Sequence, residues 1–470
     1  MRTLSTPGNA EQVASDHEHV RPGRDRRRSS GIWSLINRGL PLGGTCVNVG
    51  CVPSKALLYA GEVLHLAKHH GIPGIDLEIR NVDFAAVVRD ELALVERLRR
   101  EKYEKVLGGL EHVRFIDGEA QFLSPTELEV NGDRIAAHKI IVATGSTATV
   151  PPIPGLRDAG YLTHIDALAL QQRPDSLVVI GAGPLGLEFG QMYARFGTRV
   201  TILQRGPTVF PRTEARLAER LTEVLRSEGV HIVTGADVES VAIKGGKKEL
   251  TYTADGQTQT ASGDAILLAA GKTPNTSALN LRRAGIDTER EAIRVTPFLQ
   301  TSSANIYAAG DVTNLPKRLE MTAGHEGTLA TENALTGSAK QIDYDAVPYT
   351  VFTDPQLAGV GLTEDEQMQR LGVCACRTVP FSEVPKALIT KRTEGLIKMA
   401  IHPETGQIMG VHILAPHAGE LVAEAMMLVK HRTTIDEVLE SLPMFPTLSE
   451  SIKLAAMAFT RDISRLSCCI

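Results

Sequence analysis

A short apolar run that leads into a glycine-rich turn constrains the fold of this chain more than any other feature. Residues 177–180 are apolar and are followed by Gly181-Ala-Gly183-Pro-Leu-Gly186, a helical pattern and a second strand-like run over 198–203. Gly181 would permit a tight turn, Gly183 would let a pyrophosphate approach the backbone, and Gly186 would let the helix pack on the sheet. A glycine turn with a purely structural role is the alternative, but the order of the elements favours a dinucleotide site.

The end of the second strand bears on which nucleotide binds there. A site for NAD carries a carboxylate at this position, which binds the ribose 2′-hydroxyl. This chain has Gln204 and then Arg205, and a positive charge favours the 2′-phosphate of NADPH. Arg212 could contribute if its loop folds back, although a solvated surface arginine is an equally good interpretation. Glu188, in the helix after the turn, is included in the predicted cofactor site.

The length and composition indicate several globular domains. The chain has 470 residues, more than the roughly 250–300 at which a single core stops growing, so two to four domains are expected. Its formal net charge of -5 does not indicate a surface that binds nucleic acid. It has no run of the roughly 18 apolar residues that a membrane helix needs, and its polar N-terminus is not a secretory signal. We therefore expect a cytoplasmic protein without nucleic-acid or membrane partners.

The six cysteines occur in close pairs, which is not the pattern of a structural disulfide framework in so long a chain. Cys46 and Cys51 lie at the entrance to a predicted helix over 53–69, where they can close a small disulfide ring. A helix N-terminus stabilises a thiolate, and thiolate character serves both reduction chemistry and the binding of soft metals. Cys374 and Cys376 are expected to be an unremarkable reduced pair.

Residues 43–55, Gly-Gly-Thr-Cys-Val-Asn-Val-Gly-Cys-Val-Pro-Ser-Lys, carry a family resemblance. The stretch is similar to the active site of the glutathione reductase and dihydrolipoamide dehydrogenase family, and it resembles most closely the branch of the mercuric reductases. Besides the glycine turn described above, motifs of that family follow in order at 143–145, 271–275 and 307–311. The resemblance covers about residues 34–470, and it implies bound FAD and NADPH and a redox-active disulfide.

The resemblance assigns a role to each residue of the cysteine segment. Cys51 would be the thiolate next to the flavin, and Cys46 would be the interchange thiol. Lys55 would lie by the reactive edge of the flavin, and Asp311 would bind the ribityl chain. The other residues expected to bind cofactor are Gly43, Gly44, Thr45, Ala143, Thr144, Gly145 and Gly271.

The C-terminus points to Hg(II) as the substrate. Cys468 and Cys469 form a vicinal pair, and thiolates select soft cations; an incidental exposed pair is the alternative. In the resembling branch such a tail hands Hg(II) to the redox pair of the other subunit, which implies a homodimer with an active site shared between subunits. The expected metal ligands are Cys46, Cys51, Cys468 and Cys469.

The segment around Phe445 separates metal substrates from disulfide substrates. Glutathione reductase-like enzymes place a histidine before Pro446, as general acid–base for a leaving thiol, and this chain has Phe445 there. Hg(II) needs no such proton, so Phe445 argues against disulfide reduction. Thr447 stands where many mercuric reductases carry tyrosine. Thr447 and Glu450 also fit a helix capping box, which is the role that we expect for Glu450.

The alternation of strands and helices predicts an α/β fold followed by an α+β domain. With the resemblance, this gives two nested Rossmann-like domains, for FAD and NADPH, and a C-terminal dimerisation domain. The expected boundaries are a disordered tail at 1–33, FAD-binding segments at 34–150 and 271–345, an NADPH-binding domain at 151–270, and the dimerisation domain with its Cys-Cys tail at 346–470. Helices are predicted at 53–69, 84–110, 419–430 and 448–460, and strands at 139–146, 265–271, 305–311, 395–401 and 407–414.

The first βαβ unit for FAD is missing from the predicted fold. The resembling family begins with a strand, a glycine-rich turn and a helix that seat the FAD pyrophosphate, and residues 1–35 contain no such pattern. A charge run over 24–28 favours a solvated, disordered segment. The possible explanations are a wrong reading frame or start site, a degraded gene product, and a genuine tail with a partial FAD site; the abrupt change favours the first. Without the unit we expect weak FAD binding or none.

The preferred interpretation is an NADPH-dependent mercury(II) reductase that detoxifies mercury, in which hydride passes through FAD to the Cys46–Cys51 pair and then to Hg(II). A dihydrolipoamide or glutathione-type disulfide reductase is the first alternative, and Phe445 counts against it. A flavin-deficient, non-catalytic mercury-binding protein is the second, and the missing first unit would explain it.

Overall fold

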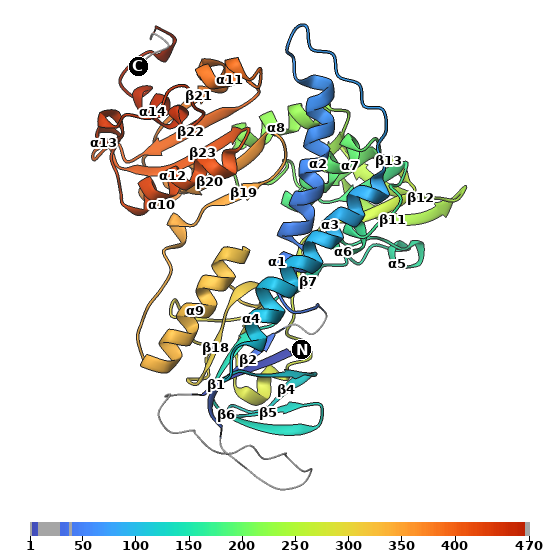
Figure 1. The fold of residues 1–470 in the computed structure, drawn as a ribbon, viewed down its shortest axis with the longest axis vertical. Coiled ribbons are helices and arrows are strands. Elements are labelled where there is room, and N and C mark those ends of the chain that lie inside the picture. Colours follow the sequence, from blue (N-terminus) through green and yellow to red (C-terminus); the bar gives the residue numbers. More distant parts are fainter. Residues whose placement is uncertain (1, 8–28, 37–39, 466–470) are drawn as a thin grey trace. The chain divides into compact units, whose positions relative to one another are not determined.

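The computed structural model describes residues 2–7, 29–36 and 40–465, which form two compact units (Figure 1). Unit 1 comprises residues 1–49, 94–148 and 272–344, and unit 2 comprises residues 50–93, 149–271 and 345–470. The chain therefore passes back and forth between the units. Residues 50–93, which we assigned to the FAD-binding domain, group with unit 2.

Unit 1 is built on a seven-stranded mixed sheet. Its central strand is β6 (Asp133–Ala143), which pairs in parallel with both β2 (Ser29–Ile36) and β18 (Ile306–Ala308). The remaining strands are β1 (Arg2–Pro7), β3 (Arg114–Asp117), β4 (Ala120–Ser124) and β5 (Glu127–Val130).

Alternate side chains of β6 enter two apolar clusters on opposite faces of this sheet. Ile140 and Val142 pack with Phe122 and Leu128, whereas Ile141 packs with Leu329 of helix α9 (Glu320–Thr336). Successive residues of a strand point to opposite faces, so this strand is buried on both sides. Short elements complete the unit: α1 (Gly44–Val49), η1 (Arg100–Glu104), α4 (Lys105–Gly108), β7 (Ser146–Ala148), β15 (Lys272–Pro274), η2 (Leu281–Ala284), β16 (Thr288–Glu289), β17 (Ala292–Ile293) and η3 (Gly310–Val312).

The N-terminal strands depart from the sequence prediction. We predicted no regular structure over residues 1–33, which is wrong for residues 2–7 and 29–33, since they lie in β1 and β2; residues 1 and 8–28 lie outside the described residues. β1 runs antiparallel to β2, with Arg2 opposite Ile36. Because a βαβ unit joins parallel strands, the antiparallel pair of β1 and β2 is not such a unit, and the absence of the first FAD unit stays a prediction.

Unit 2 contains a four-stranded parallel sheet in the order β10-β9-β8-β14. The chain forms it through β8 (Ser176–Ile180), α7 (Pro184–Arg195), β9 (Arg199–Gln204), α8 (Ala215–Ser227), β10 (His231–Thr234) and β14 (Ala265–Leu268). All five residues of β8 are buried, as expected for a central parallel strand covered on both faces. One face packs against α7 and α8, and the other against the antiparallel strands β11 (Asp237–Lys244), β12 (Lys247–Ala254) and β13 (Gln257–Gly263).

Two long helices precede this sheet in the sequence. Helix α2 (Cys51–His69) lies where we predicted a helix and packs on α7. The helix predicted at 84–110 is divided into α3 (Phe84–Arg99), the π-helical turn η1 and α4. The short helices α5 (Leu156–Ala159) and α6 (His164–Leu168) lead into β8.

The C-terminal part of unit 2 is a five-stranded antiparallel sheet with helices, as predicted for an α+β domain. Its strands follow the order β19-β20-β23-β22-β21, and their bounds are Tyr349–Val351, Gln356–Gly361, Ile408–Ala415, Leu396–Ile401 and Ala375–Pro380. Its helices are α10 (Glu364–Leu371), α11 (Pro385–Ile389), α12 (Ala418–Lys430), α13 (Ile435–Glu440) and α14 (Glu450–Met457), with short turns η4 (Tyr344–Ala346), η5 (Phe381–Glu383) and η6 (Ile463–Arg465). Within the described part of the chain, no helix is long and apolar enough to cross a membrane.

Candidate active site

A glycine turn and an asparagine shape the segment that carries Cys46. Gly43 and Gly44 both have positive φ, and a Cβ at Gly43 would lie 2.4 Å from the Val47 side chain. The buried Asn48 amide donates hydrogen bonds to the carbonyls of Pro41, Leu42 and Gly44 at 2.9–3.2 Å. These bonds fix the turn ahead of α1. Within α1, Cys46 is half-buried and Thr45 is exposed.

Cys51 is the first residue of α2, and its side chain is exposed. The Ser54 hydroxyl and the Ser54 backbone N–H both donate to the Gly50 carbonyl, at 2.6 and 3.1 Å. The turn at the start of the helix is therefore well defined. The positive end of the helix dipole stabilises an anion at this position, which favours a thiolate at Cys51.

Lys55 lies one turn further along α2 and is held by a buried carboxylate. Its Nζ lies 2.8 Å from Oε2 of Glu188 and 4.5 Å from the centroid of the Phe352 ring. The other Glu188 oxygen accepts the Phe352 backbone N–H at 2.8 Å. Glu188, which we predicted as a cofactor-binding residue, is thus the residue that positions Lys55.

The glycine turn after β8 has the geometry that a pyrophosphate cradle requires. Gly181 has a φ of 107°, and a Cβ there would lie 2.4 Å from the Ala269 carbonyl oxygen. A Cβ at Gly186 would lie 2.0 Å from the Gly181 carbonyl oxygen, so only glycine allows α7 to pack this closely. A Cβ at Gly183 would meet nothing within 4 Å. The space in front of Gly183 faces the N-terminus of α7, where backbone N–H groups can bind phosphate.

The end of β9 carries no carboxylate. The Gln204 side chain folds back on the turn: its Oε1 accepts the Ala182 backbone N–H at 2.9 Å, and its Nε2 donates to the Thr208 carbonyl at 3.2 Å. Arg205 and Arg212 are both exposed. Gly271, after β14, has a φ of 109°, and its carbonyl accepts the Thr149 backbone N–H at 3.0 Å.

Two strand ends in unit 1 bring the other predicted cofactor-binding residues together. Thr144 directly follows β6, and its buried hydroxyl donates to the Asn275 carbonyl at 2.8 Å. The Asn275 backbone N–H in turn donates to the carbonyl of Gly145 at 2.9 Å. The Ser146 hydroxyl donates to Asp311 Oδ2 at 2.6 Å. Because β6 and β18 are parallel neighbours, the segments at 143–146 and 310–311 lie at the same edge of the sheet.

Sequence reasoning missed Glu326, a residue that supports this edge. It lies on α9, and its carboxylate accepts the Gly310 backbone N–H at 2.6 Å and the Tyr344 hydroxyl at 2.9 Å. Burial raises the pKa of the Glu326 carboxyl. The pair of bonds holds the positive-φ Gly310 and, with it, the position of Asp311.

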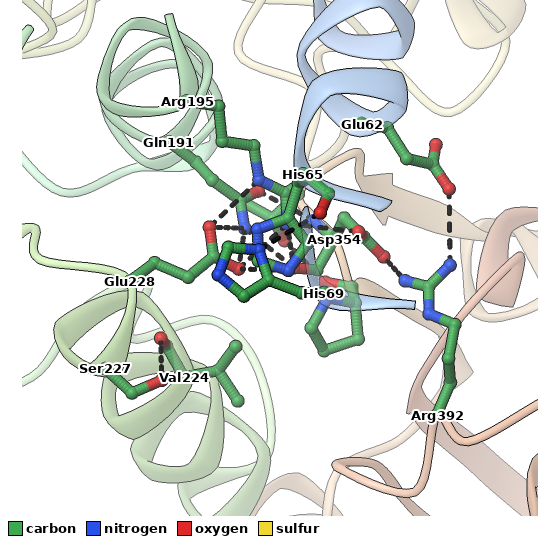
Figure 2. Close-up of polar contacts among 12 residues, drawn as sticks. Glu62, His65, His69, Gln191, Arg195, Val224, Ser227, Glu228, Asp354 and Arg392 are labelled. Atoms are coloured by element: carbon green, nitrogen blue, oxygen red, sulfur yellow. Dashed lines mark hydrogen bonds and ion pairs between the residues drawn. The ribbon is translucent and has the colours of Figure 1, made fainter. Parts of the chain in front are cut away.

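An ion-pair network, which the sequence did not reveal, anchors α2 within unit 2 (Figure 2). Arg195 of α7 binds both oxygens of Glu228 at 2.8 and 2.9 Å, and it also lies 3.0 Å from an oxygen of Asp354. Arg392 bridges Asp354 to Glu62 of α2. Every one of these side chains is at least three-quarters buried.

His65 of α2 packs against this network. Its Nε2 lies 3.9 Å from Glu228, and its ring stacks on His69 at 4.5 Å between centroids. Burial, followed by the charge of Arg195, lowers the pKa of His65 to about 4. His65 is therefore neutral at physiological pH and does not add a charge to the network.

The structure changes two predictions for the C-terminal part. The capping box at Thr447 and Glu450 is wrong: α14 begins at Glu450 with Ser449 as N-cap, and the Thr447 hydroxyl donates to the Met444 carbonyl at 2.7 Å. Glu450 is instead buried, and its Oε2 has no hydrogen-bond partner among the residues that the structure describes. Phe445 is 42% exposed. Cys468 and Cys469 lie outside the described residues.

The prediction of a reduced Cys374–Cys376 pair is also wrong. The two sulfurs are joined in a disulfide, with 6.2 Å between the Cα atoms. We could assign no role to these two cysteines from the sequence. Their spacing alone does not distinguish a disulfide from a reduced pair.

The residues present fit the predicted cofactors to different extents. The open space at Gly183 and the N-terminus of α7 fit the pyrophosphate of a nicotinamide dinucleotide. The Ser146–Asp311 pair and the positive-φ turn at Gly43 fit the flavin and ribityl half of FAD. Among the described residues, the Gly-x-Gly-x-x-Gly spacing between a strand and a helix occurs only in Ser176–Arg195.

Comparison with protein families matches both parts of the chain. The pyridine nucleotide-disulphide oxidoreductase family matches residues 26–333, and the dimerisation domain of the same family matches residues 347–456. The first match includes the segment of β2 that the sequence analysis had assigned to a tail.

Several curated proteins are similar over nearly the whole chain. The mercuric reductase of Lysinibacillus sphaericus is 37% identical over 436 residues, which are 93% of this chain and 79% of that protein. The mercuric reductase of Streptomyces lividans is 37% identical over 443 residues, covering 93% of this chain and 92% of that protein.

Solved structures share the fold. The HOCl-induced flavoprotein disulfide reductase RclA from Escherichia coli superposes with a TM-score of 0.79 at 28% identity, over 90% of this chain and 93% of RclA. LpdA from Mycobacterium tuberculosis superposes with a TM-score of 0.79 at 27% identity, over 91% and 94% of the two chains. The chain therefore belongs to the pyridine nucleotide-disulphide oxidoreductase family, as a flavin-dependent oxidoreductase related over nearly its whole length to the mercuric reductases.

Proposed function

We propose that this enzyme reduces Hg(II) to Hg(0) with electrons from NADPH, through FAD and a redox-active Cys46–Cys51 pair. The observation that carries the proposal is Cys51 at the N-terminus of α2, one turn before the paired Lys55, in a chain that has Phe445 in place of a proton-donating residue. The similarity to the mercuric reductases supports the choice of substrate.

The reaction balances without a proton donor on the substrate side. Before the first turnover, one NADPH and one proton convert the Cys46–Cys51 disulfide to two thiols and yield NADP⁺. The thiols bind Hg(II) as thiolates and release two protons, and they are not reoxidised when the metal leaves. A further two electrons from NADPH reduce Hg(II) to Hg(0), and the neutral atom no longer attracts the thiolates. Each turnover thus consumes one NADPH and one Hg(II) and yields NADP⁺, one proton and Hg(0).

The chain's own residues would prepare this chemistry. When bound, FAD would supply the two-electron carrier between NADPH and the cysteine pair. The dipole of α2 would keep Cys51 as a thiolate, and Glu188 would hold the Lys55 ammonium in place near it. Asp311, fixed by Ser146, would bind the ribityl chain.

Arg205 supports NADPH rather than NADH as the electron donor. It is exposed at the end of β9, where the neighbouring Gln204 is occupied with the glycine turn. A hydrogen bond to a charged group contributes about 1.5–3 kcal/mol. Arg205→Glu should therefore raise the KM for NADPH by about 10- to 150-fold and lower that for NADH. Equal effects on both coenzymes would contradict this assignment, and Arg212→Glu tests whether the second exposed arginine shares the phosphate contact.

We also propose a cytoplasmic homodimer in which Cys468 and Cys469 of one subunit pass Hg(II) to the cysteine pair of the other. The match to the family's dimerisation domain supports the dimer. So do Leu442, Met444 and Phe445, which expose 94, 76 and 42% of their surface in the single chain, because large exposed apolar groups are enriched where subunits meet.

The direct test is NADPH oxidation driven by Hg(II) in the presence of excess thiol, with the protein first loaded with FAD. We expect a mercury-dependent rate that Cys51→Ser and Cys46→Ser each reduce by at least about a thousandfold. The double substitution Cys374→Ser/Cys376→Ser should retain it and serves as the control. Absence of a mercury-dependent rate in the flavin-loaded wild type would overturn the proposal.

The two alternatives give different results in the same assay. A disulfide reductase would oxidise NADPH with a small disulfide and not with Hg(II). A non-catalytic mercury-binding protein would be colourless once unbound FAD has been removed, and it would still bind Hg(II) tightly. Because RclA has been solved as a Cu(II) complex, Cu(II) should be assayed alongside Hg(II) to define the metal specificity.

A further inference from the structure

Cys374 and Cys376 lie at the outer edge of the C-terminal sheet, apart from the proposed catalytic pair. β21 is the last strand of the order β19-β20-β23-β22-β21, and Cys376 stands opposite Ala400 of β22. Helix α10 ends at Leu371 and is capped by Gly372, whose φ of 72° turns the chain back toward β21. Cys374 therefore follows the end of a helix, and Cys376 lies in an edge strand.

The two sulfurs share the polar face of this strand. Ala375 and Val379 pack into the apolar cluster of the sheet, so Cys374 and Cys376, which alternate with them, point to the other face. That face carries the buried Lys398, since Lys398 stands opposite Thr378 in the same register. Lys398 binds Glu214 at 2.6 Å and also pairs with Glu364, the first residue of α10.

The side chains of Glu364, Cys374 and Cys376 form a compact ligand set. One carboxylate oxygen and the two sulfurs all lie within 4.8 Å of one another. A tetrahedral Zn(II) site with bonds of about 2.3 Å to sulfur and 2.0–2.2 Å to oxygen places its ligand atoms roughly 3.5–3.8 Å apart. The three groups can therefore reach such a cation with small movements.

We propose that Cys374, Cys376 and Glu364 form a redox-gated site for a thiophilic divalent cation, separate from the Cys46–Cys51 centre. In the oxidised chain the disulfide removes both sulfur ligands. When the disulfide is reduced, the site offers two thiolates and one carboxylate and leaves the fourth position of a Zn(II)-type ion to water.

The charges around the site permit uptake of a divalent ion. Glu214, Glu364 and Lys398 together carry one net negative charge when the two sulfurs are bonded or protonated. Binding of a divalent cation by two thiols releases two protons, so the net charge of the cluster stays the same. The Lys398 ammonium, on the same face as the sulfurs, favours their ionised form.

The gating step needs a reductant, which a small-molecule thiol supplies. Two thiols reduce the disulfide, which gives two cysteine thiols and one small-molecule disulfide. The free dithiol then exchanges its two protons for one cation. Oxidation by a small disulfide reverses both steps and releases the ion.

The experiment measures Zn(II) retained by the full-length flavoprotein after reduction with dithiothreitol and anaerobic gel filtration. We expect the wild type to retain one more Zn(II) per chain than Cys374→Ser/Cys376→Ser. The matched control repeats this comparison in chains that also carry Cys468→Ser/Cys469→Ser. The difference of one Zn(II) per chain should persist there. Glu364→Gln should weaken the site by at least about tenfold, and Glu364→Asp should recover part of the affinity. Equal retention by wild type and Cys374→Ser/Cys376→Ser would overturn the proposal.

A second measurement needs no variant and therefore does not depend on a substitution that folds. The reduced wild type is alkylated with and without Zn(II), and the peptide containing residues 374 and 376 is quantified by mass spectrometry. Protection of both cysteines by Zn(II), and loss of that protection when a chelator removes the ion from the reduced chain, is the expected result. Alkylation at the same rate with and without Zn(II) would exclude the site.

Discussion

Glu91 lies on the buried face of α3, and its charge should limit the stability of the protein at neutral and higher pH. Its side chain is 2% exposed, and neither carboxylate oxygen has a hydrogen-bond partner among the residues described. Phe84 and Val88, on the same face of α3, belong to the largest apolar cluster of unit 2. Burial raises the pKa of Glu91 from 4.5 to about 7.

The sign of the effect follows from the direction of the shift. Between pH 4.5 and 7 the folded chain holds a proton on Glu91 that the unfolded chain has lost, so stability falls as the pH rises through this range. A shift from 4.5 to about 7 corresponds to about 3 kcal/mol. The cost at pH 5 is below about 1 kcal/mol, and at pH 8 it is nearly complete.

The substitution Glu91→Gln removes the charge and keeps the shape of the protonated side chain. We expect the variant and the wild type to differ by less than about 1 kcal/mol at pH 5, and the variant to be about 3 kcal/mol more stable at pH 8. Urea unfolding at several pH values and a fixed chain concentration gives both numbers. Glu96→Gln, at an exposed position of the same helix, is the control and should show no pH-dependent gain. Parallel pH profiles of Glu91→Gln and the wild type would refute the reasoning.

Three further predictions concern the candidate site and its support. Gly183→Ala should leave the unfolding free energy unchanged and raise the KM for the nucleotide. Gly186→Ala should lower the unfolding free energy by several kcal/mol, because its Cβ would overlap a backbone carbonyl. Equal losses of stability in the two variants would contradict the turn geometry. Lys55→Met and Glu188→Gln should show a coupling energy of at least about 1 kcal/mol in a double-mutant cycle of urea unfolding, and strict additivity would argue against the ion pair. Because the folded pKa of His65 is lowered to about 4, stability should be lost as the pH falls from 6.5 toward 4, and His65→Gln should flatten this acid limb of the unfolding curve.

Local patterns were sufficient to predict the helices and strands that bear the site. The strand, glycine turn and helix over 176–195 agree with the sequence prediction because the apolar run, the three glycines and the helical pattern follow one another directly in the sequence. Helix α2 ends at the predicted residue for the same reason, since its periodicity is local. The N-terminal strand β1 was not predictable in this way, because its stabilisation comes from pairing with β2 and β3 rather than from its own residues.

The charged side chains that support the site could not be predicted, because their partners are far apart in the sequence. Glu91 and Glu326 have the same local pattern as exposed glutamates. Glu91, however, is buried with no hydrogen-bond partner among the described residues, and Glu326 holds the Gly310 turn. Periodicity assigns a charged residue to the solvent face of a helix, and that assignment fails where a second element covers it. Arg195 meets Asp354 at a separation of 159 residues, which no local pattern records.

This long-range network bears on the chemistry through α2. Cys51 and Lys55 occupy the first two turns of that helix, and its next turns are fixed by Glu62 and His65 against side chains from α7, α8 and the C-terminal part of unit 2. A buried ion pair is a weak source of stability, but it is strongly directional. We therefore interpret the Arg195–Glu228–Asp354 cluster as a device that sets the position of α2. Removal of one member should lower the unfolding free energy by about 3–5 kcal/mol, because it leaves an unpaired buried charge. It should also disturb the environment of Cys51 and Lys55, because a positioning error of about 1 Å costs about a hundredfold in rate.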